Sequence, residues 1–353
     1  MCIRDRQEPL GFGLVGCGLI SAFHGKAIEA ADGAQLIAAT DPQQERLDKF
    51  CADFGCEAAA SFEALLADPR IEVVNVLTPN AMHAQFAIPA LDAGKHVVIE
   101  KPPDMTLEKV DAMIAARDRN RRQVAISLQV RFRKPIQAMY EAIQAGRFGK
   151  LYYAGAHMKW FRDTAYYLSD DWRSKRDQGA GVTIQHAFHY IDLLHHLMGE
   201  ADSVSAKMFN LAHPDVALED TLQAFINWQS GARGIVEAST ALWPGTDIRI
   251  EINGENGTAI MQGERIVTWQ FRDEQPGDAT MTQVGDAAVK TAAGGAADFA
   301  FTEHQYMIED MVRVINEGGA PWVTLEKARG SLEIALAMYR SADAEGAEVR
   351  LPL

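Results

Sequence analysis

The chain is poor in cysteine and in long apolar segments. It holds only four cysteines in 353 residues, and they have neither metal-ligand spacing nor the density of a disulfide framework. No apolar run approaches the ~20 residues needed to span a bilayer. We therefore expect a cytoplasmic protein without disulfides, without a bound metal and without a membrane partner.

Basic residues are scarce relative to acidic ones. The sequence has 34 Lys and Arg against 48 Asp and Glu, which gives a formal net charge of -14. A field of this sign repels phosphate backbones, so nucleic acid is excluded as an expected partner. The hydrophobic share of 48% is that of a globular protein, and the length suits two domains.

The opening MCIRDR has no apolar core behind it, unlike a signal peptide. It resembles a translated adapter sequence. We expect residues 1–9 to be a disordered scar outside the fold.

Short apolar strands alternate with helical stretches over residues 10–129. The expected strands are FGLVG, AQLIAAT, VVNVL, HVVIE and VAISL. The expected helices are 22–31, 43–54, 62–66, 81–93 and 107–117. Because the strands are apolar throughout rather than alternating, they suit a parallel sheet covered on both faces. The pattern predicts a doubly wound Rossmann domain whose ligand lies at the carboxyl ends of the strands.

The turn after the first strand, in LGFGLVGCGLIS, has the spacing of a dinucleotide-binding turn. Gly16 allows a sharp turn, Gly18 leaves room for a pyrophosphate, and the small Ser21 lets the next helix pack on the strand. That helix points its N–H groups at the phosphates. The expected cofactor contacts here are Gly16, Gly18, Leu19, Ile20 and Ser21. The alternative is an ordinary structural glycine turn.

Asp41 decides the expected cofactor. It ends the second strand, about 20 residues after the turn, where a carboxylate meets the adenosine ribose. A carboxylate accepts hydrogen bonds from both ribose hydroxyls of NAD and repels the 2′-phosphate of NADP. NAD is therefore favoured, and the nearby Arg46 leaves NADP possible. Asp41 could otherwise be a turn residue before Pro42.

Two further strand ends carry unusual residues. VVNVL runs into Thr78-Pro79-Asn80, with His83 one turn later, and HVVIE runs into Glu100-Lys101-Pro102. The prolines force extended geometry and stop the strands. These loops could be plain turns, but a charged pair closing an apolar strand at the cofactor edge favours a functional interpretation.

The pattern changes after about Gln129. A helix over 134–145 and a strand LYYAGAHMKW precede a segment rich in aromatics and arginine, and a helix follows over 182–198. Further strands are expected in DSVSAKMF, TLQAFINW, ARGIVEAST, DIRIEIN, TAIMQ and RIVTWQF, with Asn-Gly turns. An exposed, mobile loop over 273–297 and helices over 299–317 and 325–342 complete the chain. We expect a mostly antiparallel sheet in a second domain over 130–353, whose final helix can pack back on the first.

The helical stretch GAGVTIQHAFHYIDLLHHLMG holds the second group of candidate residues. Gln185, His189 and Asp192 are spaced by four and three, which places them on one helical face. Three interpretations stay open. These residues are structural polar residues of the helix; or His186, His189 and Asp192 are metal ligands; or a histidine of this face is a catalytic base. An imidazole titrates near neutral pH and can accept a hydroxyl proton.

These motifs together resemble the glucose–fructose oxidoreductase, inositol dehydrogenase and MocA family. The resemblance rests on GLVGCGLIS, Asp41, TPNAMH, EKP and GAGxxxQxxxH, and it covers nearly the whole chain after Pro9. It implies a Rossmann domain followed by an α/β domain with a large open, mostly antiparallel sheet. It also implies NAD(P)-dependent oxidation of a secondary alcohol on a sugar, sugar acid, nucleotide sugar or cyclitol, or the reverse reduction, in a homodimer or homotetramer.

The resemblance assigns roles to single residues. Lys101 holds the reacting hydroxyl and assists proton transfer, and His189 is the general base. The residues that line the cofactor are Thr78, Pro79, Asn80, His83, Glu100 and Lys101. Those near the substrate or the cofactor are Trp172 and Arg173, which match a WR pair of the family. Apart from the resemblance, we expect Tyr167 and Arg173 at the mouth of the substrate pocket or, as an equal alternative, in a subunit interface. His186 is expected near the substrate, beside the face that carries His189.

Gln185 departs from the family pattern, in which many members have aspartate at this position. A glutamine can orient the imidazole but adds no charge, so His189 is expected to be a weaker base, and His186 becomes an alternative. Two other functions stay open: glycoside cleavage with a recycled NAD, and a non-catalytic NAD-binding sensor.

Overall fold

The computed structural model describes residues 8–179, 181–285, 293, 295 and 300–353. Most of the expected N-terminal scar and part of the expected loop over 273–297 lie outside these residues. The chain forms two compact units. Unit 1 contains residues 1–129 and 301–329, and unit 2 contains residues 130–300 and 330–353. We expected residues 301–329 in the second domain.

Unit 1 is built on a parallel six-stranded sheet in the order β3-β2-β1-β4-β5-β6. Its strands are β1 (Leu10–Val15), β2 (Ala34–Thr40), β3 (Glu57–Ala58), β4 (Val73–Val76), β5 (His96–Glu100) and β6 (Val124–Ser127). Every residue of β1, β4 and β6 is buried, so the centre of the sheet is covered on both faces. This is the doubly wound order of a Rossmann fold, which confirms the prediction.

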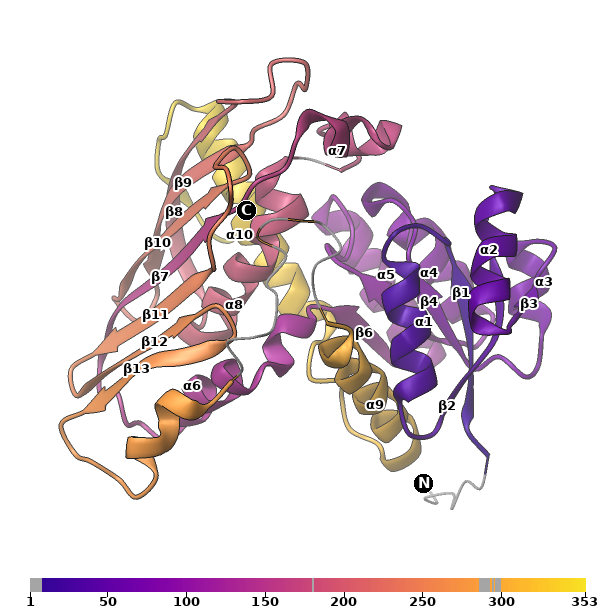
Figure 1. The fold of residues 1–353 in the computed structure, drawn as a ribbon, viewed down its shortest axis with the longest axis horizontal. Coiled ribbons are helices and arrows are strands. Elements are labelled where there is room, and N and C mark those ends of the chain that lie inside the picture. The colour runs from indigo at the N-terminus through magenta and orange to yellow at the C-terminus, as the bar shows by residue number, and fades with distance from the viewer. Residues whose placement is uncertain (1–7, 180, 286–292, 294, 296–299) are drawn as a thin grey trace. The chain divides into compact units, whose positions relative to one another are not determined.

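Helices of unit 1 connect the strands and cover the sheet (Figure 1). They are α1 (Ser21–Ala30), α2 (Gln44–Phe54), α3 (Phe62–Ala67), α4 (His83–Asp92), α5 (Leu107–Asn120) and α9 (Thr302–Glu317), with the short 3-10 helix η1 (Asn80–Met82). Local signals set several ends: the Thr106 hydroxyl caps α5, and α2 stops at Gly55 with φ +62°. The helix α9 packs along α1, and its Gln305 side chain donates to the Ala30 carbonyl.

Unit 2 is built on an eight-stranded sheet in the order β13-β12-β11-β7-β10-β9-β8-β14. Its strands are β7 (Leu151–Lys159), β8 (Ala201–Phe209), β9 (Thr221–Trp228), β10 (Arg233–Ser239), β11 (Arg249–Gly254), β12 (Gly257–Gln262), β13 (Arg265–Phe271) and β14 (Val349–Arg350). Neighbours are antiparallel except β7 and β10, which are parallel. The predicted mostly antiparallel sheet is confirmed.

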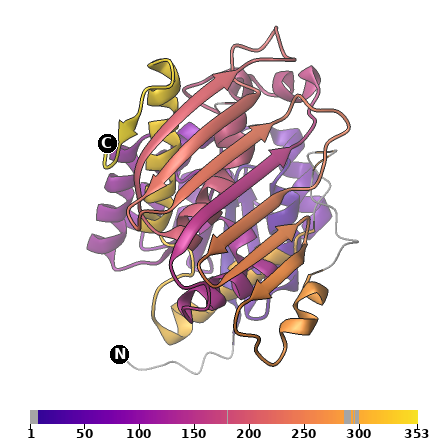
Figure 2. The ribbon, with the colours of Figure 1, turned by 90° about the vertical axis from the view of Figure 1, so that its left-hand side faces the viewer.

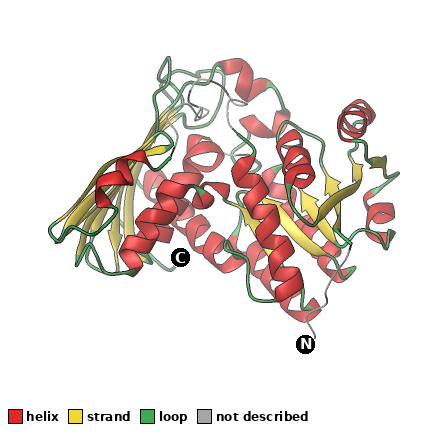
Figure 3. Ribbon diagram, turned by 60° about the horizontal axis from the view of Figure 1, so that its bottom comes forward, coloured by secondary structure: helices red, strands yellow, loops and turns green. Residues whose placement is uncertain are grey.

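The α-helices of unit 2 lie on one face of its sheet (Figure 3), and Figure 2 shows the other face bare of helices. The helical segments are α6 (Lys134–Gln144), α7 (Thr164–Leu168), η3 (Asp171–Ser174), η4 (Thr183–Ala187), α8 (Phe188–Met198) and η5 (Asp278–Gln283). Two more segments contain a boundary between the units: η2 (Gln129–Phe132) and α10 (Leu325–Asp343). No helix among the described residues is long and apolar enough to cross a membrane.

The stretch expected as one helix over 182–198 has two parts. η4 is a π-helical turn, and α8 continues it as a regular α-helix. A π turn adds residues to one revolution, which changes the faces on which side chains before and after it lie.

Candidate functional site

The turn after β1 has the shape that a dinucleotide needs. Gly16 has φ +98°, and a Cβ built there would lie 2.7 Å from the Leu77 carbonyl oxygen, so only glycine fits. A Cβ at Gly18 would meet no atom within 4 Å. The space beside Gly18 is open to an approaching group, as a pyrophosphate requires. The Ser21 hydroxyl donates to the Gly18 carbonyl at 2.6 Å and closes the turn onto α1.

Asp41 is joined to this turn. Its carboxylate accepts a hydrogen bond from the Cys17 N–H and another from the Gln43 N–H, both at 2.7 Å. Each carboxylate oxygen keeps a further lone pair, because it has two acceptor sites. The turn predicted to contact the pyrophosphate and the acidic residue predicted to contact the adenosine ribose therefore belong to one hydrogen-bonded edge of the sheet.

The ends of β4 and β5 lie next to this edge, since β1, β4 and β5 are parallel neighbours. The loop after β4 contains Thr78, Pro79 and Asn80, and η1 begins at Asn80. The His83 ring joins that loop to the next one: Nδ1 lies 2.7 Å from the Pro102 carbonyl oxygen and Nε2 lies 3.0 Å from that of Thr78. His83 is fully buried. Its burial lowers its pKa, against the opposing effect of these carbonyls.

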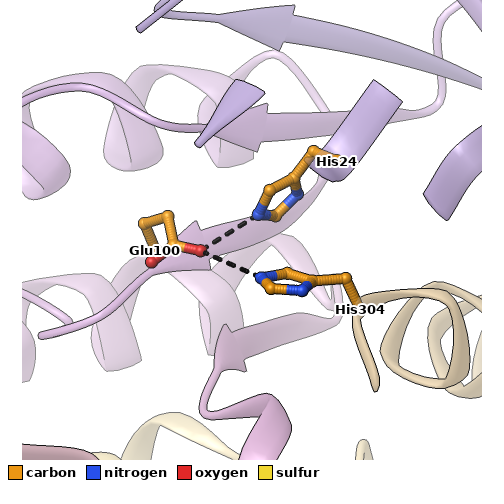
Figure 4. Close-up of side chains that lie close together, drawn as sticks. All are labelled: His24, Glu100 and His304. Atoms are coloured by element: carbon orange, nitrogen blue, oxygen red, sulfur yellow. Dashed lines mark hydrogen bonds and ion pairs between the residues drawn. The ribbon is translucent and has the colours of Figure 1, made fainter. Parts of the chain in front are cut away.

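Glu100, at the end of β5, is the centre of a buried cluster (Figure 4). Its Oε1 lies 3.0 Å from His24 Nε2 and 3.9 Å from His304 Nε2. Burial acts to raise the Glu100 pKa, but the hydrogen bond from His24 and the nearby positive charges outweigh it, so the pKa is lowered. Burial is the main cause that lowers the pKa of His304 to about 3. At neutral pH Glu100 is therefore a carboxylate and His304 is neutral.

Sequence reasoning missed three members of this cluster: His24 on α1, Asn75 within β4 and His304 on α9. The Asn75 amide donates to His24 Nδ1 at 2.9 Å. Asn75 did give a signal, because a polar residue in the middle of the apolar VVNVL strand needs a buried partner. The partner could not be found from sequence, since it lies 51 residues away.

In unit 2, the predicted residues around 185 separate into different networks. The Gln185 amide donates to the Arg173 carbonyl at 2.9 Å, and its oxygen accepts from the Tyr166 hydroxyl at 3.3 Å. Asp192 instead forms a buried, bidentate ion pair with Arg131, at 2.7 and 2.6 Å. Asp192 is thus held in the core of unit 2. Among the described residues, only His24, Glu100 and His304 bring ligand atoms close enough together to hold a metal ion; His186, His189 and Asp192 do not form such a group.

His189 differs from its neighbours in exposure. Residues 181–188 and 190–195 are all buried, whereas His189 is half-buried. His186, the alternative base, has 5% of its surface exposed. The sequence predicted an imidazole on this helix that reaches substrate, and His189 has the accessibility for that role.

The aromatic and arginine-rich segment folds around Tyr166. The Arg173 guanidinium lies 5.1 Å from the Tyr166 ring and 4.5 Å from the Trp172 ring, and it also pairs with Asp170 at 3.2 Å. The His186 ring lies 5.5 Å from that of Tyr166. Arg173, Trp172 and His186 therefore belong to one cluster with Gln185.

Tyr167, predicted near substrate, lies in the interior. Its exposed fraction is 1%, and it packs with Val216 and Leu218. Its hydroxyl pairs with that of Thr240 at 2.6 Å, and burial raises its pKa.

Comparisons with known proteins agree with this geometry. Residues 10–128 match the model of an oxidoreductase family with an NAD-binding Rossmann fold, and residues 136–260 match the GFO/IDH/MocA C-terminal domain. A myo-inositol 2-dehydrogenase of Thermotoga maritima is 28% identical over 74% of this chain and 78% of its own length.

Two solved structures are similar over almost the full chain. The WlbA dehydrogenase of Bordetella pertussis, in complex with NADH and UDP-GlcNAcA, has a TM-score of 0.89 and 30% identity, covering 99% of this chain and 100% of its own. A levoglucosan dehydrogenase in complex with NADH and levoglucosan has a TM-score of 0.83 and 25% identity, covering 98% and 100%.

Proposed function

Because the chain belongs to the GFO/IDH/MocA family of NAD-binding oxidoreductases, we propose that it transfers a hydride between NAD and a secondary alcohol of a carbohydrate or cyclitol. The candidate substrates are sugars, sugar acids, nucleotide sugars and cyclitols, the compounds handled by its relatives. One observation carries the proposal. The dinucleotide turn and the Glu100-Lys101 loop lie at the same edge of the Rossmann sheet.

The residues at that edge fit NAD. The open space at Gly18 suits the pyrophosphate, and the Asp41 carboxylate suits the ribose hydroxyls. When bound, NAD supplies a nicotinamide ring that accepts or donates a hydride. The other residues proposed to contact it are Gly16, Leu19, Ile20, Ser21, Thr78, Pro79, Asn80, His83, Glu100 and Lys101.

The proposed chemistry of the chain itself is proton transfer. The Lys101 ammonium donates a hydrogen bond to the alcohol oxygen and stabilises negative charge that develops there. His189 accepts the hydroxyl proton, for which a neutral imidazole is suited. Gln185 positions the segment that carries His189 and adds no charge. Arg173, Trp172 and His186 are proposed substrate contacts, and Tyr167 supports them from the interior.

NADH formation at 340 nm tests the function directly. The purified protein is assayed with NAD and a panel of cyclitols, aldoses, sugar acids, nucleotide sugars and methyl glycosides. We expect turnover with at least one member. If NAD binds by calorimetry but a glycoside is cleaved without NADH release, the cofactor is recycled. If NAD binds but no panel member is oxidised and no glycoside is cleaved, the proposed dehydrogenase function fails and the NAD-sensor alternative is favoured.

Asp41 gives a prediction on cofactor choice. Two like charges about 4 Å apart cost about 4 kcal/mol near a surface, and exposure of this half-buried carboxylate reduces that value. We expect NAD to bind about 100-fold more tightly than NADP, by calorimetry. Asp41→Asn keeps an acceptor oxygen and removes the charge, so it should narrow this ratio to less than tenfold. Tighter binding of NADP by the unmodified protein would show that Asp41 does not face the ribose.

We also propose that the helix-free face of the unit 2 sheet joins copies of the chain into a homodimer or homotetramer. Phe225, in the interior strand β9 between β10 and β8, is 67% exposed there, and this large exposed apolar side chain on the helix-free face is the residue that we propose contacts the partner copy. Light scattering should give a dimer or tetramer for the unmodified chain. Phe225→Glu should shift it toward monomer, whereas Leu211→Glu, at a loop residue of 64% exposure, should not. A monomeric unmodified chain contradicts the proposal.

A further inference from the structure

Lys101 lies between two residues that are more buried than it is. Glu100 has 9% of its surface exposed and Pro102 is buried, whereas Lys101 is half-buried. The backbone on both sides is therefore fixed while the side chain between them remains accessible. Two histidines, His24 and His83, contact these flanking residues. Neither has a chemical step in the proposed mechanism.

His24 fixes the residue before Lys101. Its Nδ1 accepts a hydrogen bond from the Asn75 amide at 2.9 Å, so the ring proton resides on Nε2 and is donated to Glu100 Oε1 at 3.0 Å. The other carboxylate oxygen, Oε2, accepts the backbone N–H of Lys101 at 3.1 Å. One carboxylate thus connects α1 to the backbone of Lys101.

The same cluster has the composition of a metal site, since ligand atoms of His24, Glu100 and His304 lie within 4.8 Å of one another. A metal would have to bind His24 through Nε2. The Asn75 amide donates to Nδ1, so the ring proton is on Nε2, and Nε2 has no lone pair for a metal. The geometry therefore favours a hydrogen bond that holds Glu100 over a metal centre.

His83 fixes the residue after Lys101. Its Nδ1 lies 2.7 Å from the Pro102 carbonyl oxygen, and its Nε2 lies 3.0 Å from the Thr78 carbonyl oxygen. Burial favours the neutral ring, which has a single N–H. The shorter contact indicates that this N–H is donated from Nδ1 to Pro102. His83 thereby ties the Lys101 loop to α4.

We propose that His24 and His83 are positioning residues for Lys101, His24 acting through the Glu100 carboxylate and His83 through the Pro102 carbonyl. The inference rests on the proposed role of Lys101 in proton transfer. If a reacting group is displaced by about 1 Å, the rate can fall by about 100-fold while cofactor binding is kept. Loss of either contact should therefore lower kcat rather than the affinity for NAD.

Amide substitutions can separate the two nitrogens of each ring. The amide nitrogen of asparagine is as many bonds from the backbone as Nδ1, and that of glutamine as many as Nε2. His24→Gln therefore keeps the donor toward Glu100, and His24→Asn loses it. At position 83 the order reverses, because His83→Asn keeps the donor toward Pro102 and His83→Gln loses it.

We expect asparagine and glutamine to have opposite effects on kcat at the two positions. His24→Asn and His83→Gln should lose about 100-fold, and each should be at least tenfold slower than the other variant at its position. The dissociation constant for NAD should stay within about threefold in both His24 variants, and the two His83 variants should differ from each other by no more than about threefold. His96→Asn, at the far end of β5, where the ring accepts the Gln123 N–H, is the matched control and should keep the kcat of the unmodified protein. Equal kcat values within each pair would overturn the proposal, as would a stoichiometric metal in the purified protein.

A second readout separates this proposal from the proposed function. Limiting acetic anhydride acylates lysine amines, and mass spectrometry gives the rate at Lys101 relative to the exposed Lys49. We expect His24→Asn and His83→Gln to change this ratio at least threefold, and His24→Gln and His83→Asn to keep it. An unchanged ratio in all four variants would overturn the positioning roles of His24 and His83, even if no substrate is found. If the ratio changes but a Lys101→Met variant is fully active, His24 and His83 do position Lys101, and the proposed role of Lys101 in proton transfer is wrong.

Discussion

Lys101→Met should bind NAD with the affinity of the unmodified protein and lose about 10³-fold in kcat. Methionine fills a similar volume but offers neither the charge nor the N–H donors of the ammonium group. A positioned proton-transfer group contributes about 10²–10⁴-fold to rate. The neighbouring Glu100 accepts a hydrogen bond from His24, which lowers the Glu100 pKa against the effect of burial. Calorimetry with NAD and single-turnover kinetics with the substrate found in the panel measure the two quantities separately.

Lys49→Met is the control for this result. Lys49 is an exposed lysine of the same unit, paired with Asp53 one helical turn away, and its replacement should leave both quantities unchanged. A Lys101→Met enzyme with the kcat of the unmodified protein would remove Lys101 from the mechanism. A joint loss of NAD affinity and kcat would assign it to cofactor binding instead.

Asp192→Asn should lower the free energy of unfolding by about 3–5 kcal/mol, because it leaves the Arg131 guanidinium buried without its counterion. Both side chains are 1% exposed or less. The carboxylate also accepts the Ser331 hydroxyl at 2.6 Å. The midpoint of urea unfolding, followed by tryptophan fluorescence, measures the loss.

Asp343→Asn provides the matched comparison, since Asp343 pairs with Arg176 in the same unit at 2.8 Å but with side chains 60% and 52% exposed. Exposed pairs of this kind contribute about 0–1 kcal/mol. Similar shifts of the urea midpoint for the two variants would show that the buried Arg131–Asp192 pair contributes no more to stability than an exposed pair. A loss of kcat by Asp192→Asn without loss of stability would return Asp192 to the active site.

Local chemistry determined the parts of the fold that the sequence predicted well. Gly16 could be assigned because it stands at a fixed spacing from Gly18 and Ser21 directly after an apolar strand, and Asp41 because it follows an apolar strand at the expected interval. Most strands of both sheets were found for the same reason, since their apolar residues are consecutive in unit 1 and mostly alternate with polar ones in unit 2.

Features set by distant contacts were not predicted. The partners of Glu100 are His24 and His304, which lie far from it in sequence and on two different helices. The π turn at η4 shows no sign in the residue spacing, so Gln185 and Asp192 were placed on one face although they join separate networks. The strand β3 is two exposed residues long and has no apolar pattern to reveal it.

The return of residues 301–329 to unit 1 has a consequence for synthesis of the protein. The helix α9 packs against α1, buries Met307, Ile308 and Met311, and brings His304 beside Glu100. Until these residues leave the ribosome, α1 has no cover on that side. Translation proceeds at about 5–20 residues per second, so helix α1 of unit 1 waits roughly 15–60 s until α9 has been synthesised. The nascent chain therefore exposes an apolar surface for most of its translation, which is where a chaperone would bind.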